Sequence, residues 1–194
     1  HKPTNLLSLV ANRYLTFETV SLIFEDTSNI VRYVDSESDH FPLFEFFPNK
    51  SDSYIEINLL YQSIYFWFKC ISQQQNILNI YSSGNISLIL KNNQLIIKWG
   101  KFTETIQNIS FNKWHFVFIS FNGCTYDDET IHLIIDNNKY CFSQETPSNQ
   151  TIFGHKNEFI NSPWFLSTNI QYFPNAIKSM EKIIHKIIEK GYGY

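Results

Sequence analysis

The fold of this chain is decided by the aromatic run Ser63-Ile64-Tyr65-Phe66-Trp67-Phe68-Lys69-Cys70. Aromatic and β-branched side chains are enriched in strands because they pack well on a half-buried, pleated surface. The run therefore predicts a strand that belongs to the hydrophobic core. Similar segments recur on both sides of it, and turns rich in Asn, Gly and Ser separate them.

The segments that we expect to be strands are short and rich in apolar residues. They lie at residues 41–43, 54–57, 77–81, 86–90, 94–99, 114–121, 131–135, 140–142, 164–166 and 171–173. Short strands joined by turns, with no helix between them, indicate antiparallel sheets packed as a sandwich or a barrel. We therefore assign the chain to the all-β class.

Both ends of the chain have a helical spacing of apolar residues instead. Residues 5–24 follow this spacing loosely, and the acidic segment 35–39 is typical of a linker. The other end has an apolar helix face that consists of Ile177, Met180, Ile183, Ile184, Ile187 and Ile188. We therefore expect an N-terminal helix and linker at 1–40. A sandwich follows at 41–176, and an amphipathic helix at 177–194 packs on the sandwich or on a neighbouring domain.

The composition excludes several classes of protein. With 43% hydrophobic and 17% charged residues, the chain can bury a full core and is not disordered. No uncharged apolar run reaches the roughly 18 residues of a membrane-spanning helix. The formal net charge of −3 argues against nucleic acid as a partner. Three cysteines, Cys70, Cys124 and Cys141, match no zinc spacing and predict reduced thiols in a cytosolic protein.

Several motifs carry a resemblance to a known superfamily. They are IYFWFK at 64–69, SGN at 83–85, NKWHFV at 112–117 and LIIDN at 133–137. Together they resemble the concanavalin A-like jelly roll of laminin-G domains and pentraxins over residues 44–173. The tail, at 164–166, 171–176 and 191–194, is similar to the end of the concanavalin A-like domain in BEACH-family proteins. In that family a helical region precedes the domain, so the resemblance implies that residues 1–40 also fit the end of such a region. Asn137 and Ser167 depart from that pattern, because relatives often have Gly at these positions.

The resemblance implies a function as well as a fold. It implies a concanavalin A-like jelly-roll sandwich that serves as a non-catalytic scaffold in a large cytosolic BEACH-type protein of vesicle traffic. Its partners are then other proteins or neighbouring domains of the same chain, with indirect association with endomembranes. The alternative is a carbohydrate-binding lectin or laminin-G-like module of a secreted protein. Carbohydrate is the less favoured ligand, and we expect no cofactor.

The candidates for chemistry are few. A glycosidase on this fold needs two carboxylates facing one cleft, and the sequence has no such pair in a strand. The acidic residues Asp127, Asp128 and Glu129 are weak candidates for a calcium site, and a solvated loop between residues 122 and 130 explains them better. We therefore expect neither an enzyme nor a metal site.

Aromatic and histidine residues supply the remaining candidates. Trp99 and Trp164 stand near strand ends, so they are the residues that we expect to be exposed for binding a sugar. His115 and His132 lie on adjacent strands, as a catalytic or metal-binding pair would. The resemblance implies instead that His115 is a structural, half-exposed residue of the sheet, and this role explains it better.

Overall fold

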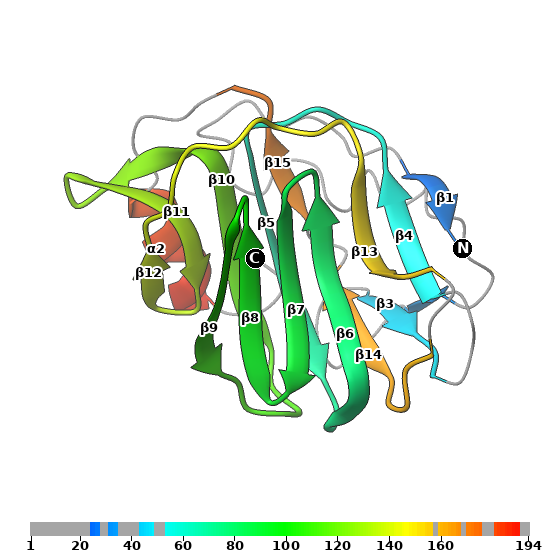
Figure 1. The fold of residues 1–194 in the computed structure, drawn as a ribbon. Coiled ribbons are helices and arrows are strands. Elements are labelled where there is room, and N and C mark those ends of the chain that lie inside the picture. The colour runs from blue at the N-terminus through cyan, green and yellow to red at the C-terminus, as the bar shows by residue number, and fades with distance from the viewer. Residues whose placement is uncertain are drawn as a thin grey trace.

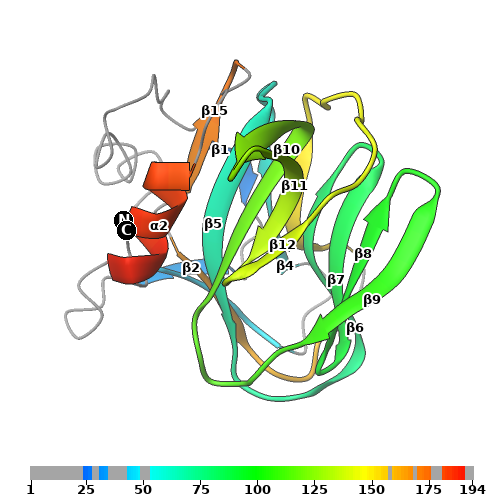
Figure 2. The ribbon, with the colours of Figure 1, turned by 90° about the vertical axis from the view of Figure 1, so that its left-hand side faces the viewer.

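A computed structural model describes residues 24–27, 31–34, 43–48, 53–156, 159–167, 170–175 and 181–190. Within these residues, two antiparallel sheets face each other and one helix lies outside them (Figures 1 and 2). The all-β, two-sheet sandwich predicted from the sequence is therefore confirmed. No helix within the described part of the chain has the length and apolar character needed to cross a membrane.

The first sheet has seven strands. In spatial order they are β1 (Phe24–Thr27), β4 (Ser53–Ile57), β13 (Thr151–His155), β6 (Gln74–Ser83), β7 (Ile86–Asn92), β8 (Gln94–Trp99) and β9 (Phe102–Asn108). Strand β13 pairs with β6 only at Thr151 and Ile152. The first half of β6 is therefore left without a strand on that side, and this gap becomes important below.

The second sheet has eight strands. In spatial order they are β12 (Asn138–Tyr140), β11 (Glu129–Ile135), β10 (His115–Tyr126), β5 (Ser63–Cys70), β14 (Trp164–Ser167), β3 (Leu43–Phe46) and β2 (Val31–Val34), and β15 (Gln171–Phe173) also pairs with β5. The aromatic run is thus a central strand, between β10 and β14. The expected loop at 122–130 is instead a hairpin, because β10 continues to Tyr126 and β11 begins at Glu129.

The N-terminal region departs from the prediction. Strands β1 and β2 lie inside the segment that we assigned to a helix and a linker, and they pair with β4 and β3. Four-residue strands are too short to show a period of two, so only their pairing partners reveal them. The rest of the expected helix at 5–24 and the expected linker at 35–39 lie outside the described residues.

Two layers of apolar side chains hold the sandwich together. The inner layer lies between the sheets and includes Phe66, Phe68 and Val117. The second layer lies on the outer face of the eight-stranded sheet and includes Trp67 and Phe116. Helix α2 (Glu181–Lys190) covers this outer face, with Ile184 and Ile187 fully buried in it. The C-terminal helix therefore packs on the sandwich.

Candidate functional site

The candidate site begins at an irregularity in strand β6. Gln74 pairs with Asn92 and Leu78 pairs with Leu90, so four steps along β6 match two steps along β7. Such a bulge bends a strand and turns its side chains away from their regular alternation. The consequence is that the segment Gln75-Asn76-Ile77 is exposed at three successive positions, where a regular strand would bury one of them.

Gln74 fastens a second segment beside the bulge. Its side chain is 1% exposed, and its Oε1 accepts hydrogen bonds from the main-chain N–H groups of Asn161 (3.1 Å) and Ser162 (3.2 Å). Its Nε2 donates to the carbonyl oxygen of Ser162 at 2.8 Å. The carboxamide thus takes the place of a neighbouring strand in the gap beyond the end of β13, where unpaired main-chain groups would be costly.

Asn161 makes the reciprocal contacts. Its Oδ1 accepts the main-chain N–H of Gln75 at 2.6 Å, and its Nδ2 donates to the carbonyl of Gln73 at 3.1 Å. Nδ2 of Asn76 donates to the carbonyl of Phe159 at 3.3 Å. We name Gln74 and Asn161 the amide clamp. The clamp fixes the position of Phe159 relative to the bulge.

A pocket of about 450 Å³ lies between the bulge and the clamped segment. Its lining residues are Gln75, Asn76, Ile77 and Phe159. Phe159 is 57% exposed and Ile77 is 44% exposed, so two apolar side chains face solvent beside two carboxamides. None of the four side chains is ionisable. The volume lies within the usual range for small-molecule sites, and the lining suits an uncharged ligand with both apolar and hydrogen-bonding surfaces.

The two tryptophans expected to be exposed are buried instead. Trp99 stacks on Phe142 at 5.0 Å, and its Nε1 donates to the carbonyl of Ser143 at 2.7 Å. Trp164 stacks on Phe46 at 4.1 Å inside the core. A position near a strand end does not expose a side chain that points inward. Neither ring is available to stack on a sugar.

The acidic candidates Asp127, Asp128 and Glu129 lie at the tip of the β10–β11 hairpin. Asp127 and Asp128 have φ angles of 50° and 63°, as a tight turn requires, and Asp127 pairs with Lys139 at 3.1 Å. A hydrogen bond with Glu181, and then that with Lys139, lowers the pKa of Asp127, while the contact with Asp127 raises the pKa of Glu181. The described residues include no group of three or more His, Cys, Asp or Glu that could hold a metal ion.

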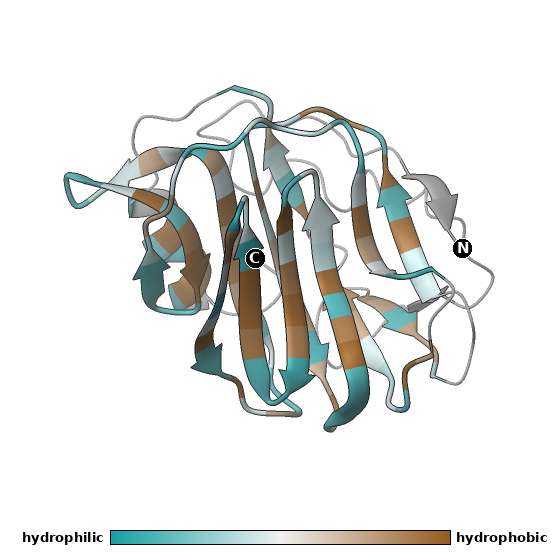
Figure 3. Ribbon diagram, viewed as in Figure 1, coloured by the Kyte–Doolittle hydropathy of each residue, from teal (hydrophilic) through white to brown (hydrophobic). Residues whose placement is uncertain are grey.

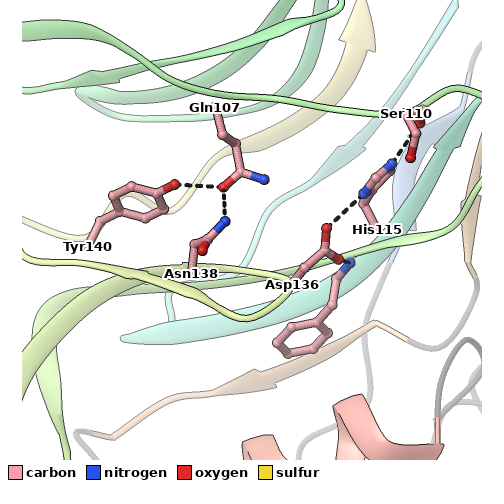
Figure 4. A network of polar contacts seen from close by, with 7 residues as sticks. Gln107, Ser110, His115, Asp136, Asn138 and Tyr140 are labelled. Atoms are coloured by element: carbon pink, nitrogen blue, oxygen red, sulfur yellow. Dashed lines mark hydrogen bonds and ion pairs between the residues drawn. The ribbon is translucent and has the colours of Figure 1, made fainter.

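His115 is buried, and not half-exposed as expected. Its Nδ1 lies 2.8 Å from Oδ2 of Asp136, and its Nε2 lies 2.8 Å from the carbonyl oxygen of Ser110 (Figure 4). Oδ1 of Asp136 accepts the main-chain N–H of Phe116. The serine offers its main-chain carbonyl and not its hydroxyl, so these residues do not form the Ser-His-Asp arrangement of a hydrolase. They hold the start of β10 against the turn after β11.

His132 has a separate environment. Its Nδ1 accepts the main-chain N–H of Phe142 at 3.2 Å, and its ring lies edge-on to Trp99 at 5.5 Å. Burial lowers its pKa. Its contacts are therefore those of a neutral core residue.

Sequence reasoning missed the pocket residues. The carboxamide run Gln73-Gln74-Gln75-Asn76 was a usable signal, because polar amides are depleted from regular strand interiors. Nothing in the sequence, however, connects this run to Phe159, since the two meet only in the folded chain.

No protein-family model and no curated protein matches this chain. Its similar solved structures include the "Botulinum Neurotoxin Type G Receptor Binding Domain", at 15% identity and a TM-score of 0.56, over 88% of this chain and 46% of that one. The binding domain of botulinum neurotoxin DC in complex with rat synaptotagmin II matches at 15% identity and a TM-score of 0.57, over 88% and 47%. The serotype D ligand binding domain in complex with N-acetylneuraminic acid matches at 15% identity and 0.60, over 89% and 46%.

These similarities concern the fold. The chain spans about half the length of the structures that it matches. At such low identity the match establishes a shared β-sandwich and leaves the ligand open. None of these structures supports the resemblance to BEACH-family proteins.

Proposed function

We propose that this chain is a non-catalytic module that binds carbohydrate in the pocket lined by Gln75, Asn76, Ile77 and Phe159. The observation that carries this proposal is an exposed aromatic ring held beside two carboxamides in a pocket of about 450 Å³. Sugars have the matching chemistry, because they combine apolar C–H faces with hydroxyl groups. An aromatic ring packs against the first, and carboxamides both donate to and accept from the second.

The comparisons lend support from a different direction. The similar structures are named as receptor-binding or ligand-binding domains, and one is a complex with N-acetylneuraminic acid. This is an analogy of fold. It supports carbohydrate as a class of ligand but does not identify a binding site. It also supports a binding module over an enzyme. We therefore prefer the lectin-like alternative to the scaffold that the sequence resemblance favoured.

A scaffold role within a cytosolic BEACH-type protein remains a second candidate. The observation in its favour is the amphipathic helix α2, which packs on the sandwich through Ile184 and Ile187 and so continues the resemblance of the tail. Under this proposal the partners are proteins or neighbouring domains, with a location at the periphery of endomembranes. Binding of a protein by a chain that binds no glycan would favour this candidate.

A glycan array probed with the purified chain tests the first proposal. We expect selective binding that is the same with calcium and with a chelator, because the pocket supplies no carboxylate to hold an ion. Phe159→Ala should abolish the signal. Phe102→Ala is the matched control, because Phe102 is 62% exposed on β9 and does not line the pocket. A blank array, or equal loss in both variants, would overturn the proposal.

A further inference from the structure

We propose that the pocket selects a neutral pyranose that carries a methyl group, either in an N-acetyl substituent or at C6 of a 6-deoxy sugar. This inference rests on the proposed function and specifies the ligand of the same site. It follows from three properties of the pocket: its charge, its two apolar side chains and the free groups of its carboxamides.

Among the described residues, those that line the pocket offer no charged partner for an acidic sugar. Its four lining side chains are uncharged, and Lys156, three residues before Phe159, is engaged by Glu56 at 3.1 Å and by the ring of Tyr54 at 4.7 Å. Burying a carboxylate without a partner is costly. A neutral sugar is therefore favoured over an anionic one such as N-acetylneuraminic acid.

The two apolar side chains of the pocket, Ile77 and Phe159, favour a ligand with two apolar surfaces. Phe159 offers a flat ring, which fits the C–H face of a pyranose. Ile77 is a separate, branched side chain that lines the same pocket and comes from the bulge of β6. A plain hexose has hydroxyl groups around its edge and leaves Ile77 uncovered. A methyl substituent gives Ile77 an apolar contact.

The carboxamide of Asn76 and the main chain of Gln75 are already positioned. The Asn76 side chain donates one N–H to the carbonyl of Phe159, and its Oδ1 and second N–H can bond a ligand. Gln75 is fixed through its main-chain N–H by Asn161. Since these bonds hold the Asn76 side chain and the Gln75 main chain before the ligand arrives, less ordering is needed on binding.

The experiment measures dissociation constants by ligand-observed NMR for five monosaccharides. They are glucose and galactose, N-acetylglucosamine, L-fucose, and N-acetylneuraminic acid. We expect N-acetylglucosamine or L-fucose to bind about fourfold more tightly than the plain hexoses, which is the effect of burying one methyl group. Whichever of the two is tighter identifies the source of the methyl group. N-Acetylneuraminic acid should bind most weakly.

Two variants assign the effect to residues. Ile77→Ser should remove the fourfold preference for methyl-bearing sugars over plain hexoses, while Leu60→Ser, at a residue that is 60% exposed and does not line the pocket, should keep it. Phe159→Ala should weaken every neutral sugar about tenfold or more. Lys91→Gln, at the position of β7 that faces the bulge, should not alter the discrimination against N-acetylneuraminic acid.

The outcomes separate the two proposals. Absence of binding for all five sugars overturns the proposed function, and this inference with it. Binding of plain hexoses as tight as that of the methyl-bearing sugars overturns this inference alone. The same holds if N-acetylneuraminic acid binds as tightly as the neutral sugars, or if Ile77→Ser keeps the preference.

Discussion

The outer faces of the two sheets differ in what covers them. On the eight-stranded sheet, the outward-pointing residues Tyr65, Trp67, Phe116 and Phe118 are buried in a second apolar layer beneath α2. On the seven-stranded sheet, β4 alternates between buried and half-buried positions, and hydrophobic and hydrophilic bands alternate along β4 and β6 in Figure 3. A continuous apolar strand therefore signals a sheet with cover on both faces, and alternation signals a face open to solvent.

The open face is also where the candidate site lies. Ile77 and Phe159 remain exposed there, because none of the described residues forms a second layer over them. The covered face is fixed by packing, whereas the site on the open face is fixed by hydrogen bonds of the amide clamp. Stability and ligand binding should therefore respond to different substitutions.

The largest effect should come from the covered face. Ile187→Ala removes a fully buried side chain from beneath α2 and should lower the free energy of unfolding by about 2–5 kcal/mol. Ile77→Ala, on the open face, is the matched control and should change it by less than about 0.5 kcal/mol. Urea unfolding measures both values. Equal effects of the two substitutions would contradict the distinction between the faces.

A smaller effect should come from the amide clamp. Gln74→Ala leaves the main-chain N–H groups of Asn161 and Ser162 without their acceptor and should cost about 1–3 kcal/mol. Gln75→Ala keeps the main-chain bond to Asn161 and should be close to neutral for stability. Hydrogen exchange at Asn161 and Ser162 provides the local readout. Unchanged protection of these amides in Gln74→Ala would show that the clamp does not hold the segment.

The covered face was predictable from the sequence because its signal is local. The aromatic run and the isoleucines of the C-terminal helix each show a pattern within a single segment. Strand β9 was missed because Phe102, Thr103, Glu104 and Thr105 are all exposed, which leaves no alternation to detect. Strand β13 was missed as well, since Thr151 and Gly154 interrupt its apolar residues.

The candidate site was not predictable, because it depends on contacts between distant segments. Gln74 and Asn161 are 87 residues apart, and a two-residue bulge is needed to expose Ile77. The burial of Trp99 has the same origin. The indole N–H of Trp99 donates to the carbonyl of Ser143, which lies 44 residues further along the chain. The sequence around Trp99 does not predict that the segment containing Phe142 and Ser143 covers its ring.

The smallest effect should come from His132, at the break in the ladder between β10 and β11. Its Nδ1 accepts the N–H of Phe142, so the neutral ring carries its hydrogen on Nε2, and burial lowers the pKa below its usual 6.5. As the pH falls below about 6.5, the unfolded chain takes up a proton that the folded chain resists, so stability decreases. We expect a loss of less than about 1 kcal/mol between pH 7.5 and 5.5, because this range extends only about one unit below the ordinary pKa of a histidine. His132→Asn retains an acceptor for Phe142 and should flatten this dependence in thermal unfolding. An identical pH profile for the wild type and His132→Asn would exclude His132 as the source.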